Sequence, residues 1–114
     1  MKNITNATIK SIIKNGGATI NKSGNRITMK TGYQVSKQDL LIVSVSEFTK
    51  DILKSLIQKL SRRGEYLGVW IDSGRVYIDI SHRTSTKKQA MQVGRELNQL
   101  SVLRWRDGEC LAVV

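Results

Sequence analysis

Apolar and polar residues alternate over two neighbouring segments, Tyr66 to Asp72 and Arg75 to Ser81. Alternation with a period of two is typical of β-strands with one buried and one exposed face. Ser73-Gly74 between them can form a two-residue hairpin turn. One face of the predicted hairpin is apolar and should lie under helices; it consists of Leu67, Val69, Ile71, Val76, Ile78 and Ile80.

The opposite face of this hairpin carries aromatic residues. A turn at Ser73-Gly74 places Trp70 opposite Tyr77, on the same face as Tyr66, Arg75 and Asp79. Our first expectation is that an N-terminal hairpin packs over this face and makes Trp70 and Tyr77 part of a second core. The alternative is an open face on which these rings stack nucleic-acid bases.

Helical spacing follows the apolar run at 40–45, which is suited to a buried strand. Ser46 is a predicted N-cap, and the apolar stripe of the helix is Phe48, Ile52, Leu53, Leu56, Ile57 and Leu60. A second helix is expected from about Thr86 to Asn98, capped by Thr84 or Ser85. Two last strands, 102–106 and 109–113, would be joined by a type I′ turn at Asp107-Gly108.

Residues 40–113 therefore read as β-α-β-β-α-β plus a short last strand, which predicts the α+β class. The specific expectation is a ferredoxin-like sheet with two helices on one face. A short helix capped by Asn6 and a β-hairpin, with strands at 19–21 and 26–30, precede it. We expect a single domain over 1–114, with an N-terminal subunit at 1–36, a split βαβ-like unit at 40–114, and a hinge at 37–39.

The charge of the chain changes the functional expectation. Nineteen Lys and Arg residues against nine Asp and Glu residues give a net charge of +10, with a pI of about 10.1. Such an excess attracts polyanions, of which nucleic acid is the commonest inside cells. The basic residues form no dense juxtamembrane run, and no stretch is apolar for about 18 residues. A membrane partner is therefore not expected.

Three further groups of residues are candidates for contacts with nucleic acid. The helix and its C-terminal end carry a basic set, the second helix begins with two lysines, and the strand at 102–106 alternates two arginines with Trp105. The alternation places those two arginines on one face, where they could hold phosphates. For each group a plain solvated surface is the competing interpretation. Together with three residues of the aromatic face, the candidates are Lys50, Lys54, Lys59, Arg62, Arg63, Trp70, Arg75, Tyr77, Lys87, Lys88, Arg104 and Arg106.

The sequence offers little for catalysis. His82 is the only histidine and Cys110 the only cysteine, which removes the usual zinc ligand sets. Ser81, His82 and Asp79 are too close along one strand to form a catalytic triad. Asp72 and Asp79 are the nearest approach to the paired carboxylates of a metal-dependent nuclease. We expect no catalytic residue, no metal site and no cofactor.

Three segments resemble a group of small uncharacterised proteins from bacteriophages and integrative elements. They are Gly16-Gly-Ala-Thr-Ile-Asn21, Gly32-Tyr-Gln-Val-Ser36, and 68–81 with the sequence GVWIDSGRVYIDIS. Residues 90–95 and the turn at 107–109 fit the same pattern. The resemblance implies a phage or mobile-element origin in a bacterial host. It carries over no catalytic residues.

Three functions follow in order of preference. The first is a non-enzymatic accessory protein that binds DNA, RNA or a host nucleoprotein complex through its basic surface. The second is an anti-CRISPR-like inhibitor of host defence that contacts an effector protein. The third is a metal-dependent nuclease. Residues 1–17 lack the apolar core of a secretion signal, so we expect a soluble protein of the bacterial cytoplasm. The sequence leaves its oligomeric state open.

Overall fold

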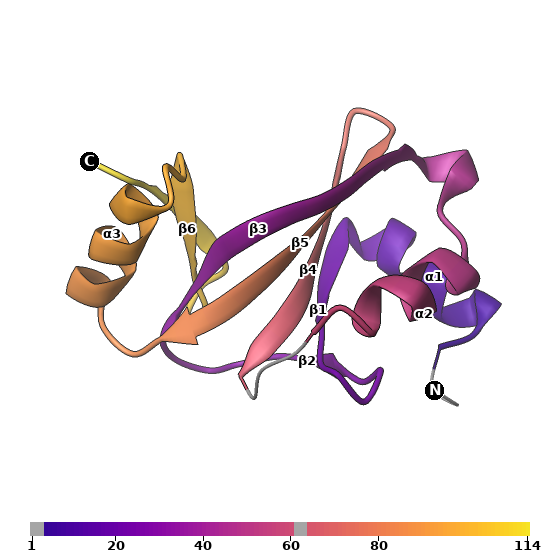
Figure 1. Ribbon diagram of the computed structural model, residues 1–114, viewed down its shortest axis with the longest axis horizontal. Helices are drawn as coiled ribbons and strands as arrows, with labels where there is room; N and C mark the ends of the chain where they lie inside the picture. The colour runs from indigo at the N-terminus through magenta and orange to yellow at the C-terminus, as the bar shows by residue number, and fades with distance from the viewer. Residues whose placement is uncertain (1–3, 61–63) are drawn as a thin grey trace.

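The computed structural model describes residues 4–60 and 64–114. Over this part of the chain the fold belongs to the α+β class, with three α-helices, a short 3-10 helix and a seven-stranded antiparallel sheet (Figure 1). The elements are α1 (Asn6–Asn15), β1 (Gly17–Ile20), β2 (Arg26–Ile27), β3 (Tyr33–Ser44), η1 (Val45–Glu47), α2 (Lys50–Ile57), β4 (Glu65–Asp72), β5 (Arg75–Thr84), α3 (Lys87–Glu96), β6 (Ser101–Arg104) and β7 (Glu109–Ala112).

The sheet has the order β2-β1-β4-β5-β3-β6-β7. Four adjacent strands of this order, β4-β5-β3-β6, are those expected between residues 40 and 106. The N-terminal hairpin extends the same sheet beyond β4, and β7 extends it beyond β6. The expected α+β class is confirmed, whereas the specific ferredoxin-like topology is not, because the sheet has seven strands.

The N-terminal hairpin does not cover the aromatic face of the β4–β5 hairpin, and our first expectation for it was wrong. Strand β1 lies beside β4 instead, with pairs from Gly17↔Trp70 to Ile20↔Leu67. The physical reason is the edge of β4, whose backbone groups would otherwise lack ladder partners. This edge-on position leaves the Trp70 and Tyr77 face uncovered.

Strand β3 crosses the expected hinge. It runs without a break from Tyr33 to Ser44, along much of the length of the molecule (Figure 1). The hinge prediction at 37–39 was therefore wrong. The register with β5 shifts between Ser36 and Gln38 and again between Asp39 and Leu41. These irregularities interrupt the apolar–polar alternation and bend the strand, which explains why the sequence suggested a break here.

All three helices lie on one face of the sheet. Helices α1 and α2 share a core with β1, β4 and β5, and this core contains the predicted apolar face of the hairpin, with Leu67 and Val76 fully buried. Helix α3 packs in a second cluster on Val35 of β3 and Val102 of β6. Val35 pairs with His82, which alternates in phase with Ile80 of the first core. The two clusters therefore occupy the same side of the sheet.

Each helix begins after a threonine cap, and none after the residue expected from the sequence. The caps are Thr5, Thr49 and Thr86, and each side chain accepts a hydrogen bond from the backbone N–H three residues on. The predicted caps Asn6 and Ser46 lie inside α1 and η1 instead. Threonine accepts this bond as serine and asparagine do, so residue type alone could not separate neighbouring candidates.

Type I′ geometry occurs at Ser73-Gly74, where a two-residue turn was expected, and not at Asp107-Gly108. Ser73 and Gly74 have φ values of 52° and 77°, as a type I′ turn requires at both central positions. At Asp107-Gly108 the glycine alone has positive φ, so the type I′ prediction there was wrong. The loop joins Arg104 to Glu109, which face one another across it. Asp107 is held in this loop by hydrogen bonds from Arg104.

Candidate functional site

The side of the sheet away from the helices forms a groove with a volume of about 770 Å³. This size lies within the range of ordinary small-molecule sites. Its walls come from both ends of the sheet: Ala18 and Thr19 of β1 lie on one side, and Leu103 of β6 and Cys110 of β7 on the other. Trp70, Tyr77 and Asp79 contribute from the central strands. The groove is therefore the concave face of the sheet.

Strong curling of the sheet creates this concavity. The hydroxyl of Thr19 on β1 donates to Gln34 Oε1 on β3 at 3.0 Å, although two strands lie between β1 and β3. Gln34 Nε2 in turn donates to Ser81 Oγ at 2.7 Å. A flat sheet would hold strands β1 and β3 about 14 Å apart. Thr19 and Ser81 are buried although no helix covers them, because the sheet folds over this polar row.

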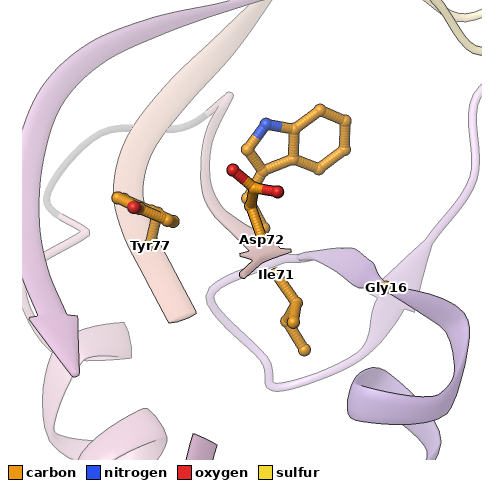
Figure 2. Close-up of a pocket in the computed structure, with 5 residues that line it drawn as sticks. Gly16, Ile71, Asp72 and Tyr77 are labelled. Carbon is orange, nitrogen blue, oxygen red and sulfur yellow. The ribbon is translucent and has the colours of Figure 1, made fainter. Parts of the chain in front are cut away.

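Trp70 and Tyr77 stand at one end of the groove. They are paired across β4 and β5, as predicted. Trp70 is 53% exposed, and Tyr77 is half-buried. With Gly16, Ile71 and Asp72 they line a second, smaller hollow of about 420 Å³. Figure 2 shows the side chains of Ile71 and Asp72 leaving β4 in opposite directions, with Tyr77 on the neighbouring strand.

Gly17 of β1 leaves space for the Trp70 ring because it has no side chain. A Cβ on Gly17 would lie 2.4 Å from the carbonyl oxygen of Val69 and 3.3 Å from Cε3 of Trp70. The φ of Gly17 is +153°, which side chains rarely adopt. Strand β1 can therefore approach β4 closely only with glycine here. One side of the indole rests on this backbone, and the exposed part remains available for a ligand.

Asp79 is the carboxylate of the groove. It follows Tyr77 by two residues on β5, so both side chains point to the same face. Burial raises the pKa of Asp79 to about 6; the nearby Ser36 hydroxyl lowers it, the charge of Asp39 raises it further, and the Gly68 backbone N–H lowers it. Neither Asp79 Oδ1 nor Ser36 Oγ, both buried, has a partner in hydrogen-bond geometry.

The groove itself is not a basic channel. The charged residues among those that line it are Arg26, Asp39 and Asp79, and the Arg26 guanidinium donates to Ser11 Oγ at 2.6 Å. A polyphosphate chain would find two carboxylates along this surface. The groove suits an uncharged aromatic or amide-bearing group, while any phosphate would have to stay on its rim.

The predicted basic residues do not gather around the groove. Lys50 and Lys54 belong to α2, Lys59 follows it, and Lys87 and Lys88 begin α3. Both helices cover the other face of the sheet. Arg62 and Arg63 lie outside the described residues. Among the predicted set, Trp70, Tyr77 and the exposed Arg75 share the groove face, because Arg75 alternates in phase with Tyr77 on β5.

Arg104 and Arg106 do not form the expected pair on one strand face. Strand β6 ends at Arg104, and Arg106 lies in the following loop. Arg104 Nη2 makes ion pairs of 2.7 Å with both Asp107 and Glu109. The hydrogen bond to Asp107 raises the pKa of Arg104, and the same contact holds the pKa of Asp107 near 2. Two carboxylates therefore already neutralise the Arg104 guanidinium.

The carboxylates proposed for a nuclease are not neighbours. Asp72 pairs with Arg75 at the end of the hairpin, whereas Asp79 pairs with Gly68 four residues along β4. Four residues of strand span about 13 Å, too far for two carboxylates to share the closely spaced ions of a two-metal site. The cross-strand neighbour of Asp79 on its other side is Asp39. No cluster of three His, Cys, Asp or Glu side chains suited to a metal occurs among the described residues.

Several groove residues were missed by sequence reasoning. Thr19, Gln34 and Ser36 have no motif, and their chain segments resemble solvated strands. Trp105 was assigned only to the face opposite its flanking arginines. It lines the groove, and its indole Nε1 is buried without a hydrogen-bond partner. The available signal was the Gly32-Tyr-Gln-Val-Ser36 segment, whose polar alternation places Gln34 and Ser36 on one side of a strand.

No helix in the described parts of the chain combines the length and apolarity needed to span a membrane. Comparisons of the chain with protein-family models, curated proteins and solved structures gave no significant match. The residues of the groove therefore carry the functional interpretation on their own.

Proposed function

We propose that this protein binds single-stranded nucleic acid and holds unpaired bases in the groove, without acting as an enzyme. The observation that carries the proposal is the uncovered pair of Trp70 and Tyr77 at the groove end. Sheets that bind single strands use such rings to stack bases, at about 1–3 kcal/mol per base. The groove volume of about 770 Å³ can hold a base, and most of the side chains that line it are uncharged.

The net charge of +10 supports the same function at longer range. Basic residues on the outside of the fold would attract the phosphate chain and raise the association rate. Arg75, exposed beside the aromatic pair, is placed to meet a phosphate of a strand whose bases enter the groove. The basic outer surface would therefore attract the phosphate chain, and the groove would make the contacts with the bases.

The test compares groove variants with a helix-face variant in fluorescence-anisotropy titrations of short single-stranded DNA and RNA. Trp70→Ala is expected to weaken binding roughly 5- to 150-fold, which corresponds to the loss of one stacked base. Tyr77→Phe keeps the ring and serves as the matched control for Tyr77→Ala. Raising the salt from about 50 to about 200 mM should weaken binding by wild type and variants alike.

The control for the general charge is the triple variant Lys50→Ala, Lys54→Ala and Lys59→Ala, on the opposite face from the groove. It should lose a modest and sequence-independent part of the affinity. If it loses binding while Trp70→Ala does not, the helix face is the nucleic-acid surface and the groove is not. Wild-type protein that binds no oligonucleotide at low salt would contradict the proposal and favour a protein partner, such as a defence effector of a bacterial host.

A further inference from the structure

A polar floor lies next to the aromatic pair in the groove. Asp79 projects from β5 two residues beyond Tyr77 and on the same face, about 7 Å further along the strand. A base stacked on Tyr77 or Trp70 would therefore have its hydrogen-bonding edge within reach of the Asp79 carboxylate. Asp79 is one of the residues that line the groove.

The residue opposite Asp79 leaves space for its side chain. Gly68 faces it across the ladder, and a Cβ on Gly68 would lie 2.6 Å from Asp79 Oδ1 and 3.2 Å from Gln34 Nε2. Any other residue at position 68 would displace these groups. Oδ1 of Asp79 points toward this glycine and is buried. The torsion that turns a carboxylate about its last bond is broad, so a rotation of the carboxylate brings both oxygens toward a ligand in the groove.

The neighbouring polar groups leave Asp79 with unused acceptor capacity. Thr19, Gln34 and Ser81 bond to one another. Oδ1 of Asp79 has no partner in hydrogen-bond geometry. An ionised carboxylate that is partly removed from water and incompletely hydrogen-bonded gains from a ligand that brings donors.

We infer that the groove selects unpaired guanine, whose N1–H and N2 amino group donate together to the Asp79 carboxylate while the ring stacks on the aromatic pair. Among the common bases guanine alone has two adjacent donors on its pairing edge. Adenine and cytosine offer an amino group beside an acceptor nitrogen, and uracil and thymine offer one N–H between two acceptors. A carboxylate, which only accepts, repels those acceptors. This inference rests on the proposed function.

The charged and titratable groups that face Asp79 set its pH response. They are Tyr77 on its own strand and Asp39 on β3, with Arg26 elsewhere along the groove; His82 lies on the helix side. Burial raises the pKa of Asp79 to about 6. Above this value the carboxylate is ionised and accepts both donors, and below it the bound proton removes one acceptor. Guanine preference should therefore fall as the pH drops below about 6.

The experiment uses short oligothymidylates that carry at their centre guanine, hypoxanthine, which lacks the N2 amino group, or thymine. Wild type at pH 7.5 should bind the guanine oligomer roughly 10- to 150-fold more tightly than the hypoxanthine oligomer, as the loss of one hydrogen bond to a charged group gives. Asp79→Asn should abolish this ratio and keep the affinity for the thymine oligomer. A thermal melt checks that the variant is folded. Asp51→Asn, at an exposed position of α2 on the other face of the sheet, is the matched control that should keep the preference.

Equal binding of the guanine and hypoxanthine oligomers by wild type overturns the guanine inference and leaves base stacking intact. A guanine preference that survives Asp79→Asn also overturns it, because another group must then read the base. Failure of all three oligomers to bind overturns the proposed function as well. A preference that is present at pH 7.5, lost at pH 5 and absent in Asp79→Asn supports the inference.

Discussion

Thr19 and Gln34 meet at 3.0 Å although β4 and β5 lie between their strands. This contact shows that the sheet is strongly curled, because a flat sheet would hold these two strands too far apart for it. It closes the concave side over Ser81, which is 1% exposed and bonded to the same Gln34. The same curl turns a sheet face that would otherwise be flat into a groove, so the shape of the site depends on polar contacts as well as on the hydrophobic core.

Gln34→Leu should therefore loosen the curl. The substitution keeps the approximate size of the side chain and leaves the buried hydroxyls of Thr19 and Ser81 without their partner. Buried polar groups that lose their hydrogen bonds cost about 1–3 kcal/mol, and the free energy of unfolding should fall by that amount in urea titrations. Gln38→Leu is the matched control on the same strand, because Gln38 is exposed. Equal losses in both variants would show that the Gln34 contacts do not stabilise the curl.

The pH dependence of stability should reveal Asp79. Its pKa is raised to about 6 from the ordinary value of 3.8. Between pH 4 and 6 the unfolded chain has lost this proton while the folded chain keeps it, so the Asp79 contribution lowers stability as the pH rises. Asparagine does not titrate, so the Asp79→Asn variant does not lose stability in this way as the pH rises. At pH 7 it should be more stable than wild type by up to about 3 kcal/mol, and the difference should disappear below pH 4.

Chemical denaturation at a series of pH values measures this effect. Asp39→Asn, which removes only the negative neighbour of Asp79, should recover a small part of the gain. An Asp79→Asn variant less stable than wild type at pH 7 would contradict the prediction. A carboxylate that destabilises the folded protein is expected where it contributes to ligand binding. The same denaturation series in the presence of an oligonucleotide should therefore show a smaller stability difference between wild type and Asp79→Asn.

The registry of the β4–β5 hairpin could be predicted from the sequence residue by residue. Strict alternation fixed which side chains share a face, and Ser73-Gly74 allowed one turn, so the pairing of Trp70 with Tyr77 followed. The placement of the N-terminal hairpin could not be predicted. Its short strands can satisfy their backbone at the edge of a sheet or pack on its face, and the local pattern does not distinguish the two.

The groove was hidden from sequence for a different reason. Its floor depends on irregularities in β3 between Ser36 and Leu41 and on a hydrogen bond from the Thr19 hydroxyl to Gln34 Oε1, fifteen residues away in the chain. A glutamine or threonine in a strand usually indicates a solvated position. Only the three-dimensional curl converts these side chains into a buried polar row, so the sequence did not indicate Asp79 as a residue that contacts a base.

His82 offers a site-specific probe of the helix side of the central strand β5. It is the only histidine, so its titration by NMR is free of overlap. Burial lowers its pKa, the charge of Lys37 lowers it further, and Glu65 raises it. Lys37 and Glu65 form an ion pair of 2.8 Å beside it. Lys37→Met removes the cation and leaves the carboxylate, so the pKa of His82 should rise.

Lys37→Arg keeps the positive charge and is the matched control, in which the pKa of His82 should remain close to that of wild type. A pKa that is unchanged in Lys37→Met would show that the ion pair does not act on the imidazole. Because His82 lies on the helix side of β5, ligands in the groove should leave its titration almost unaffected. This separates it from Asp79 when both are followed over the same pH range.

The turn at Ser73 should accept a stabilising substitution. Serine is held there at a φ of 52°, a left-handed conformation that asparagine and glycine adopt more readily. Ser73→Asn creates the Asn-Gly pair preferred in type I′ turns and should raise the free energy of unfolding by about 0.5–1 kcal/mol.

The matched control is Asp107→Asn in the other hairpin loop, where φ is not positive and the carboxylate binds Arg104. That change should bring no gain, because it removes an ion pair without relieving any strain. Equal responses of the two variants in chemical denaturation would mean that local sequence preference alone, and not the backbone conformation of each turn, decides their stability.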